Sequence, residues 1–96
     1  MAIKTKPFDI SEHLETDEDI HAFLQEVASI GESSDLVRAI GYVAKAKGMT
    51  EISRMTGMSR SSLYESLSGE GSPKFDTIDK VLHALGMGIS VEKVAA

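Results

Sequence analysis

The chain has 96 residues, of which 42% are hydrophobic and 26% are charged, and these values are ordinary for one soluble globular domain. It contains no cysteine, which excludes disulfides, thiolate metal sites and cysteine nucleophiles. No apolar run approaches the ~18 residues that span a membrane, and no basic-then-apolar leader opens the chain. We therefore expect a cytoplasmic protein.

The net charge of −5 hides an uneven distribution of charge along the chain. Residues 1–35 carry two basic and nine acidic side chains, whereas residues 36–96 carry eight basic and six acidic ones. Such asymmetry indicates two surfaces with different partners. A solvated acidic helix without any partner is the alternative interpretation of the first segment.

The N-terminal segment is predicted to be an arm followed by an acidic helix. Residues 1–9 show no periodicity, and Pro7 favours an extended backbone before it. Apolar residues then recur on one helical face from Ile20 to Ile30. Thr16 or Asp17 is expected to cap this helix, and Gly31 to end it.

Further helical patterns follow, each interrupted by glycine. The second is expected to start with an N-cap among residues 33–35 and to stop at Gly48. Short helices are predicted over 50–56 and from Ser59 to Leu67, then a loop over 68–73 and a last helix from Asp76 or Thr77 to Gly86. The weak alternation in the tail fits a short strand or a swapped arm. These patterns predict an all-α fold of five or six helices, with a core of Ile40, Val43, Ile52, Met55, Met58, Leu63, Leu67, Ile78, Leu82 and Leu85.

One segment carries a more specific pattern, which reads MTEISRMTGMSRSSLYESL over residues 49–67. The small Ser53 is followed four residues later by Gly57, which suits a turn with positive φ. Met58 would plug the corner, Ser59 would cap the next helix, and Leu63 would point into the core. This order is typical of a helix-turn-helix, whose second helix enters the DNA major groove. An ordinary helical hairpin is the alternative.

The exposed face of the second helix suits contact with DNA. Small hydroxyl groups allow close approach, and Arg60 can form two hydrogen bonds with a guanine edge or, alternatively, clamp a phosphate. Thr50 and Lys74 are predicted to contact the phosphate backbone, and Tyr64 either packs over the helix or donates to a phosphate. The candidate DNA-binding residues are Thr50, Ser59, Arg60, Ser61, Ser62, Tyr64, Glu65 and Lys74.

The segment resembles the Cro/lambda-repressor-type helix-turn-helix domain. From about Lys4 to Val91, the chain also resembles the antidote (antitoxin) proteins of bacterial addiction modules, HigA-like, on the arm ending Pro7-Phe8-Asp9, the acidic helix and the block SLYESLSGEGSPKFDT. The resemblance implies a protein that neutralises a RelE/HigB-like ribonuclease toxin and represses its own operon by binding operator DNA. It implies a toxin-binding segment over residues 1–32 and a lambda-repressor-like DNA-binding domain over 33–96.

The surface for a basic toxin is expected to combine acidic and apolar side chains. Its candidate residues are Phe8, Leu14, Asp17, Glu18, Asp19 and Phe23. A single recognition helix makes few contacts, so we expect a homodimer, formed through the last helix and the tail over 87–94.

An enzyme is not expected, because no metal-ligand pair of histidines, hydrolase motif or phosphate loop is found, and no cofactor or metal is predicted. A stand-alone repressor without a toxin is the main alternative. A module that uses only its acidic helix for protein interaction is another.

Overall fold

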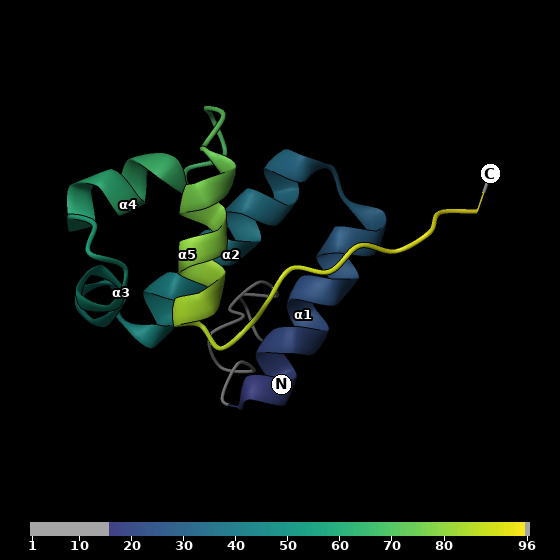
Figure 1. Cartoon of the computed structure of the whole chain (residues 1–96), viewed down its shortest axis with the longest axis horizontal. Helices are drawn as coiled ribbons and strands as arrows, with labels where there is room; N and C mark the ends of the chain where they lie inside the picture. The colour runs from purple at the N-terminus through teal and green to yellow at the C-terminus, as the bar shows by residue number, and fades with distance from the viewer. Residues whose placement is uncertain (1–15, 96) are drawn as a thin grey trace, which may run out of the picture.

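The computed structural model describes residues 16–95, and over this range the chain forms five α-helices and no β-strand (Figure 1). The all-α prediction is therefore confirmed for the described residues. The predicted arm with Phe8, and the candidate toxin-binding residue Leu14, lie outside them. The helices are α1 (Asp17–Ile30), α2 (Ser33–Lys47), α3 (Met49–Thr56), α4 (Arg60–Ser66) and α5 (Phe75–Ala84).

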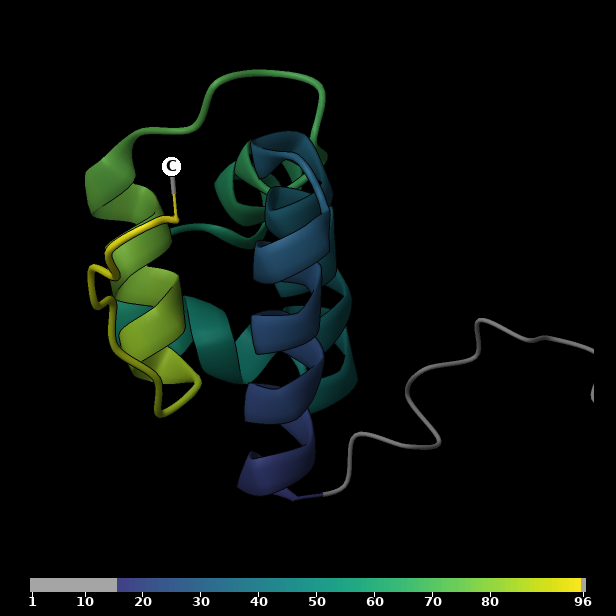
Figure 2. The same cartoon turned by 90° about the vertical axis from the view of Figure 1, so that its right-hand side faces the viewer.

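Helix α2 lies at the centre of the fold. It packs against α1, α3 and α5, and α3 in turn packs against α4 and α5. As a result α1 and α4 lie on opposite flanks of the molecule (Figure 1). Figure 2 looks onto the α1 flank and shows α5 and the tail beside α1.

The start of α1 is stabilised by a reciprocal pair of hydrogen bonds. The Thr16 hydroxyl accepts from the Asp19 amide at 3.0 Å, and the Asp19 carboxylate accepts from the Thr16 amide at 3.3 Å. This capping box satisfies two amides that the first helical turn leaves without partners. Of the two predicted caps, Thr16 is therefore the one used, and Gly31 ends the helix as expected.

Two other helices begin slightly earlier than predicted. Helix α2 has Glu32 as its N-cap, because the Asp35 carboxylate reaches back to accept from the Glu32 amide at 2.9 Å. Helix α5 begins at Phe75, with Lys74 at the N-cap position. The strand suggested for the tail is wrong for residues 87–95, which are irregular. With only weak alternation and no paired partner strand, these residues lack the hydrogen bonds that define a strand.

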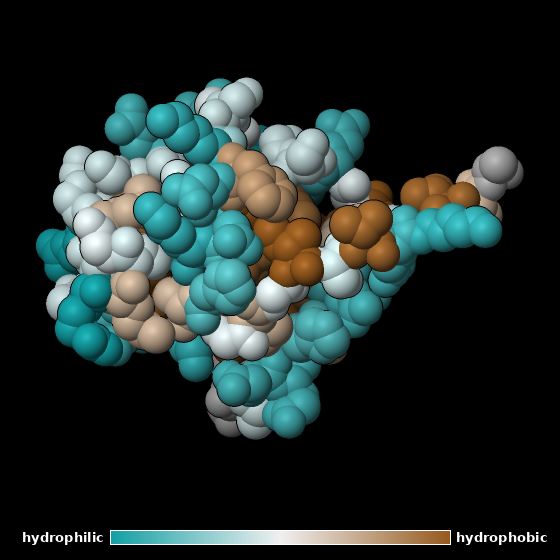
Figure 3. Space-filling model, viewed as in Figure 1, coloured by the Kyte–Doolittle hydropathy of each residue, from teal (hydrophilic) through white to brown (hydrophobic). Residues whose placement is uncertain are grey.

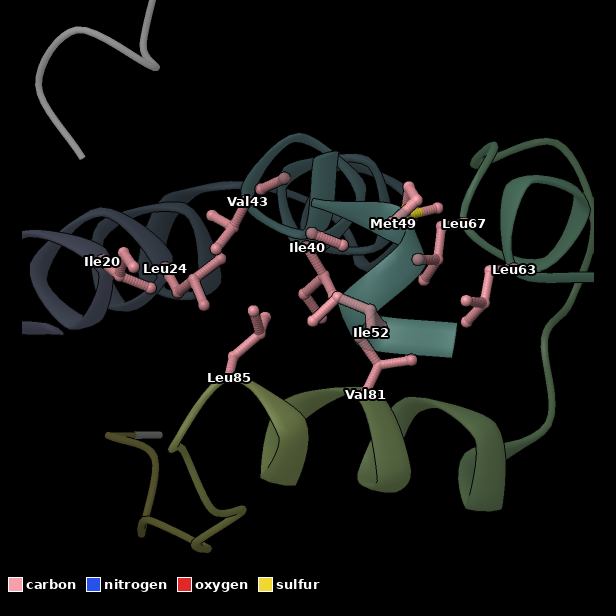
Figure 4. Close-up of a cluster of buried hydrophobic side chains, with 12 residues drawn as sticks. Ile20, Leu24, Ile40, Val43, Met49, Ile52, Leu63, Leu67, Val81 and Leu85 are labelled. Atoms are coloured by element: carbon pink, nitrogen blue, oxygen red, sulfur yellow. The ribbon is translucent and has the colours of Figure 1, made fainter. Parts of the chain in front are cut away.

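One core joins all five helices (Figure 4). Most of the predicted core residues are buried, and Met58, Ile78 and Leu82 pack partly buried against them. Helix α1 also contributes Ile20 and Leu24 to this cluster. The buried residues are Ile20, Leu24, Ala39, Ile40, Val43, Ala44, Met49, Ile52, Leu63, Leu67, Val81 and Leu85.

The placement of Met55 in the core was wrong, because its side chain is 51% exposed. Met49 and Ile52 are buried and Thr56 is half-buried, so these positions define the inner face of α3. With about 100° of rotation per residue, Met55 lies roughly a quarter turn from the centre of that face. It therefore points to solvent although its spacing from Ile52 is helical.

A close approach of α2 to the end of α4 depends on Gly41. A Cβ atom at this position would lie 2.9 Å from the Leu67 carbonyl oxygen, which is backbone and cannot rotate away. We expect Gly41→Ala to destabilise the fold by about 1 kcal/mol or more, because overpacking costs ~1–3 kcal/mol and the gain in helix propensity is ~0.5–1 kcal/mol. Urea unfolding measures the difference.

Gly71→Ala is the matched control for this substitution. A Cβ atom on Gly71 meets nothing within 4 Å, and its φ lies outside the left-handed region. Its free energy of unfolding should stay the same or rise slightly. Equal stability of the two variants would show that α2 and α4 do not require the glycine contact.

Candidate nucleic-acid interface

The turn between α3 and α4 is fixed by glycine and by two side-chain hydrogen bonds. Gly57 adopts the left-handed conformation, with φ 77° and ψ 9°. The Ser53 hydroxyl donates to the Met58 carbonyl at 2.5 Å, and the Thr56 hydroxyl accepts from the Met58 amide at 3.2 Å. Ser53 therefore has two roles. It is small, as the sequence pattern required, and its hydroxyl group also closes the turn by a hydrogen bond.

Helix α4 is anchored at both ends in the way the sequence predicted. Ser59 is its N-cap, and the Ser59 hydroxyl accepts from the Ser62 amide at 3.1 Å. Leu63 is fully buried, and Leu67, the C-cap residue, is 5% exposed. These two leucines hold the inner face of α4 on the core (Figure 4). The remaining residues of α4 are exposed, except the half-buried Ser66.

All the candidate DNA-binding residues lie on the surface. The structure brings two of them together, because an Arg60 Nη atom donates to the Thr50 hydroxyl at 3.1 Å. This hydrogen bond joins the first turns of α3 and α4. It holds the guanidinium group at the exposed edge of both helices and leaves its other donors available.

Tyr64 belongs to the same exposed face of α4 and is 48% exposed. The Lys45 ammonium group lies 5.8 Å from the centre of the Tyr64 ring, within the range of a cation–π contact. Lys45 is not among the DNA-binding residues predicted from the sequence. The signal that was missed is the spacing of Arg38, Tyr42 and Lys45, which places all three on one polar face of α2.

Two carboxylates lie among these residues and affect the local charge differently. Glu51 pairs with Arg54 within α3. The hydrogen bond from Arg54, supported by the positive charge, holds the pKa of the Glu51 carboxyl below its usual value. The pair therefore stays ionised and neutral overall at pH 7, whereas Glu65 is exposed and pairs with no described residue.

Lys74 is exposed and takes no part in the hydrogen bond between Thr50 and Arg60. It is the N-cap residue of α5, beyond the loop that follows α4. No ion pair links it to another residue in the range 16–95. It is thus placed for a contact separate from that of Arg60.

The candidate toxin-binding residues of α1 have unequal surroundings. The Asp17 carboxylate lies 3.7 Å from the Lys47 ammonium group, and Asp19 takes part in the capping box. Glu18 is exposed and has no ion pair with a described residue. Phe23 is partly buried against the core, which leaves only part of its ring for a partner.

No helix in the described part of the chain is long and apolar enough to cross a membrane. Within residues 16–95, no group of three histidine or carboxylate side chains is arranged to hold a metal ion.

Comparison with known proteins assigns the chain to a family. Residues 4–93 match the family model described as "Probable addiction module antidote protein", so the chain belongs to this antidote family. It is also 38% identical over 93 residues to an uncharacterized protein of Haemophilus influenzae (strain ATCC 51907 / DSM 11121 / KW20 / Rd), covering 97% of this chain and 96% of that protein. No solved structure matches significantly.

The family supports an antitoxin, as the sequence resemblance implied. An antidote implies a toxin partner of some kind, and it suggests a regulatory protein rather than an enzyme.

Proposed function

We propose that the chain is the antitoxin of a type II toxin–antitoxin module with two functional surfaces. Helices α3 and α4 would form a lambda-repressor-like helix-turn-helix that binds operator DNA and represses the module's own operon. The arm and α1, residues 1–32, would bind and neutralise a RelE/HigB-like ribonuclease. Both activities belong in the cytoplasm, where the operon is transcribed.

The hydrogen bond between Arg60 and Thr50 is the observation that carries the DNA-binding proposal. It places a cation at the point where the starts of α3 and α4 meet, with Ser59, Ser61 and Ser62 exposed beside it. Short side chains there allow a helix to approach base edges closely. An Arg fork in such a position recognises guanine through two hydrogen bonds.

The toxin-binding proposal is supported by the charge and place of α1. Its first turn carries Asp17, Glu18 and Asp19, and no basic residue lies in its last turn. A toxin that cleaves RNA must attract phosphates, so its working face is expected to be basic. Because α1 and α4 lie on opposite flanks (Figure 1), one chain has room for both partners. Phe8 and Leu14 remain part of this proposal.

Charge reversal on α1 tests the toxin surface. Glu18 and Glu26 are both exposed and form neither the capping box nor an ion pair with a described residue. We expect Glu18→Lys combined with Glu26→Lys to slow association with the toxin, most strongly at low salt, because complementary charge mainly raises the association rate. Stopped-flow or surface-plasmon measurements at two salt concentrations give this rate.

Asp79→Lys provides a control on α5, where the Asp79 carboxylate pairs with His83 of the same helix. It should leave the association rate nearly unchanged. If the α1 double variant bound the toxin at the wild-type rate and affinity, the acidic face of α1 would not be the toxin site. Reversal of Asp17 or Asp19 is less informative, because each also stabilises the fold.

A homodimer is part of the proposal, and the tail is its candidate surface. Ile89, Val91 and Val94 are 42%, 96% and 84% exposed. In Figure 3 apolar side chains gather along this tail, beside the hydrophilic surface of α1. Two recognition helices about 34 Å apart would contact successive turns of DNA. Sedimentation velocity at micromolar concentration tests the dimer, and a strict monomer both free and on DNA would contradict it.

A stand-alone repressor is the second candidate, because the same DNA-binding surface would serve it. Purification of the tagged chain, expressed from its native operon, distinguishes the antitoxin from the stand-alone repressor. Mass spectrometry identifies the proteins that co-purify with the chain. The antitoxin proposal predicts a small basic protein encoded next to the gene. Recovery of the chain without such a partner, together with operator binding, would favour the stand-alone repressor.

A further inference from the structure

A shallow hollow of about 280 Å³ lies between α2 and the end of α4. Its walls combine exposed aromatic and cationic side chains with a glycine and two buried residues of the core. They include Arg38, Tyr42 and Lys45 from α2, and Tyr64, Leu67 and Ser68 from α4 and the turn after it.

The hollow is built by close packing of α2 on the loop after α4. Gly41 allows the Leu67 carbonyl to approach, and the Arg38 side chain lies over Gly69, where a Cβ atom would come within 2.5 Å of it. Both glycines therefore hold the two rims at a fixed separation. A surface with this geometry is present before any ligand arrives.

The positively charged side chains around the hollow favour the binding of an anion. Lys45 has no ion pair with any residue in the described range, and its ammonium group lies 5.8 Å from the centre of the Tyr64 ring. Arg38 is 3.4 Å from Asp35, and both side chains are half exposed, so this pair is weak. Tyr42, which also lines the hollow, is 52% exposed and adds a hydroxyl donor.

We propose that this hollow binds a phosphate of the duplex flanking the bases that α4 reads, with Lys45 and Tyr42 as the donors. The inference rests on the proposed operator binding. It follows from continuity, because the Lys45–Tyr64 contact joins the hollow directly to the recognition face of α4. Lysine, arginine and tyrosine side chains are among the groups that commonly contact phosphates in DNA complexes.

Two variants remove the phosphate donors without touching the core. Lys45→Ala removes the cation, and Tyr42→Phe removes one hydroxyl and keeps the ring. Their affinities are measured by fluorescence anisotropy for two operator duplexes, one with several flanking base pairs and one trimmed to the recognised bases. Lys47→Ala is the matched control, since Lys47 belongs to the same helix but its ammonium group lies 3.7 Å from Asp17 of α1, on the flank opposite α4 (Figure 1).

On the long duplex, we expect Lys45→Ala to weaken binding about tenfold, as for loss of a charge-assisted hydrogen bond. The salt slope should fall by roughly one unit per site. Tyr42→Phe should lose less, about threefold, because it removes one hydrogen bond and no charge from the protein. On the trimmed duplex both variants should match the wild type, and ethylation of one flanking phosphate should weaken the wild type but not Lys45→Ala.

The outcomes separate this inference from the proposed function. If Arg60→Ala loses operator selectivity while Lys45→Ala and Tyr42→Phe bind like the wild type, the hollow is not a phosphate site and the proposed function stands. Equal losses for Lys45→Ala and Lys47→Ala on both duplexes would mean that only net charge matters, and would overturn the inference. Failure of the wild type to prefer operator over scrambled DNA would overturn both.

Discussion

Leu63→Ala is expected to lower the free energy of unfolding by ~2–5 kcal/mol, the usual cost of truncating a buried leucine. Leu63 is fully buried and is the residue by which the short helix α4 enters the core (Figure 4). Truncation removes its contacts and leaves a cavity that the fixed turn at Gly57 prevents α4 from closing. Urea unfolding followed by circular dichroism measures the loss.

Met55→Ala is the matched control for this prediction. The two residues flank the same turn, but Met55 is half exposed, so its truncation should change the free energy of unfolding by no more than ~0.5 kcal/mol. If Leu63→Ala also lowered the free energy of unfolding by less than about 0.5 kcal/mol, Leu63 would not anchor α4.

Arg60→Ala is expected to weaken operator binding and to relax selectivity at one base-pair position per half-site. The lost contact is worth ~1–3 kcal/mol of discrimination between bases. We expect this contact with a base because the Thr50 hydroxyl holds the Arg60 guanidinium group at the exposed start of α4. Binding to a library of operator variants at two salt concentrations measures both affinity and selectivity.

Lys74→Ala should affect DNA binding in a different way. A phosphate contact carries no sequence information, so binding to operator and random DNA should weaken about equally. The salt slope should fall by roughly one unit per site. If Arg60→Ala and Lys74→Ala each lost one constant factor on every sequence, Arg60 would be a phosphate clamp rather than a base reader.

Local rules predicted much of this fold because several helix ends depend on neighbouring residues alone. Gly57 and Ser59 fix the turn and the cap between α3 and α4, and both were evident from their spacing. Thr16 was one of two possible caps for α1, and the geometry of Asp19 decided between them. Such interactions span three or four residues, so the sequence displays them directly.

Features that depend on contacts between distant segments of the chain were harder to predict from the sequence. Met55 has a helical spacing from Ile52, but only the positions of α2 and α5 decide which side of α3 is buried. The burial of Ile20 and Leu24 against the core likewise follows from α1 packing on α2. No local pattern predicts which helix covers which.

The candidate DNA-binding site also combines features that local sequence predicts with features that depend on the folded chain. Its eight residues were predicted from local patterns to contact DNA, and each is exposed. The hydrogen bond between Arg60 and Thr50 joins residues ten positions apart, and the contact of Lys45 with Tyr64 joins different helices. Such pairs need the turn angle and the helix packing, which are properties of the folded chain.

The central claim is that this antidote family member recognises its operator through α3 and α4. The most direct test is an anisotropy titration of the purified chain, at one physiological salt concentration, on the duplex upstream of its own gene and on a scrambled duplex of equal length. The proposal predicts that the upstream duplex binds ~10³-fold more tightly or better, the lower end for specific recognition. Equal affinity for the two duplexes would contradict it.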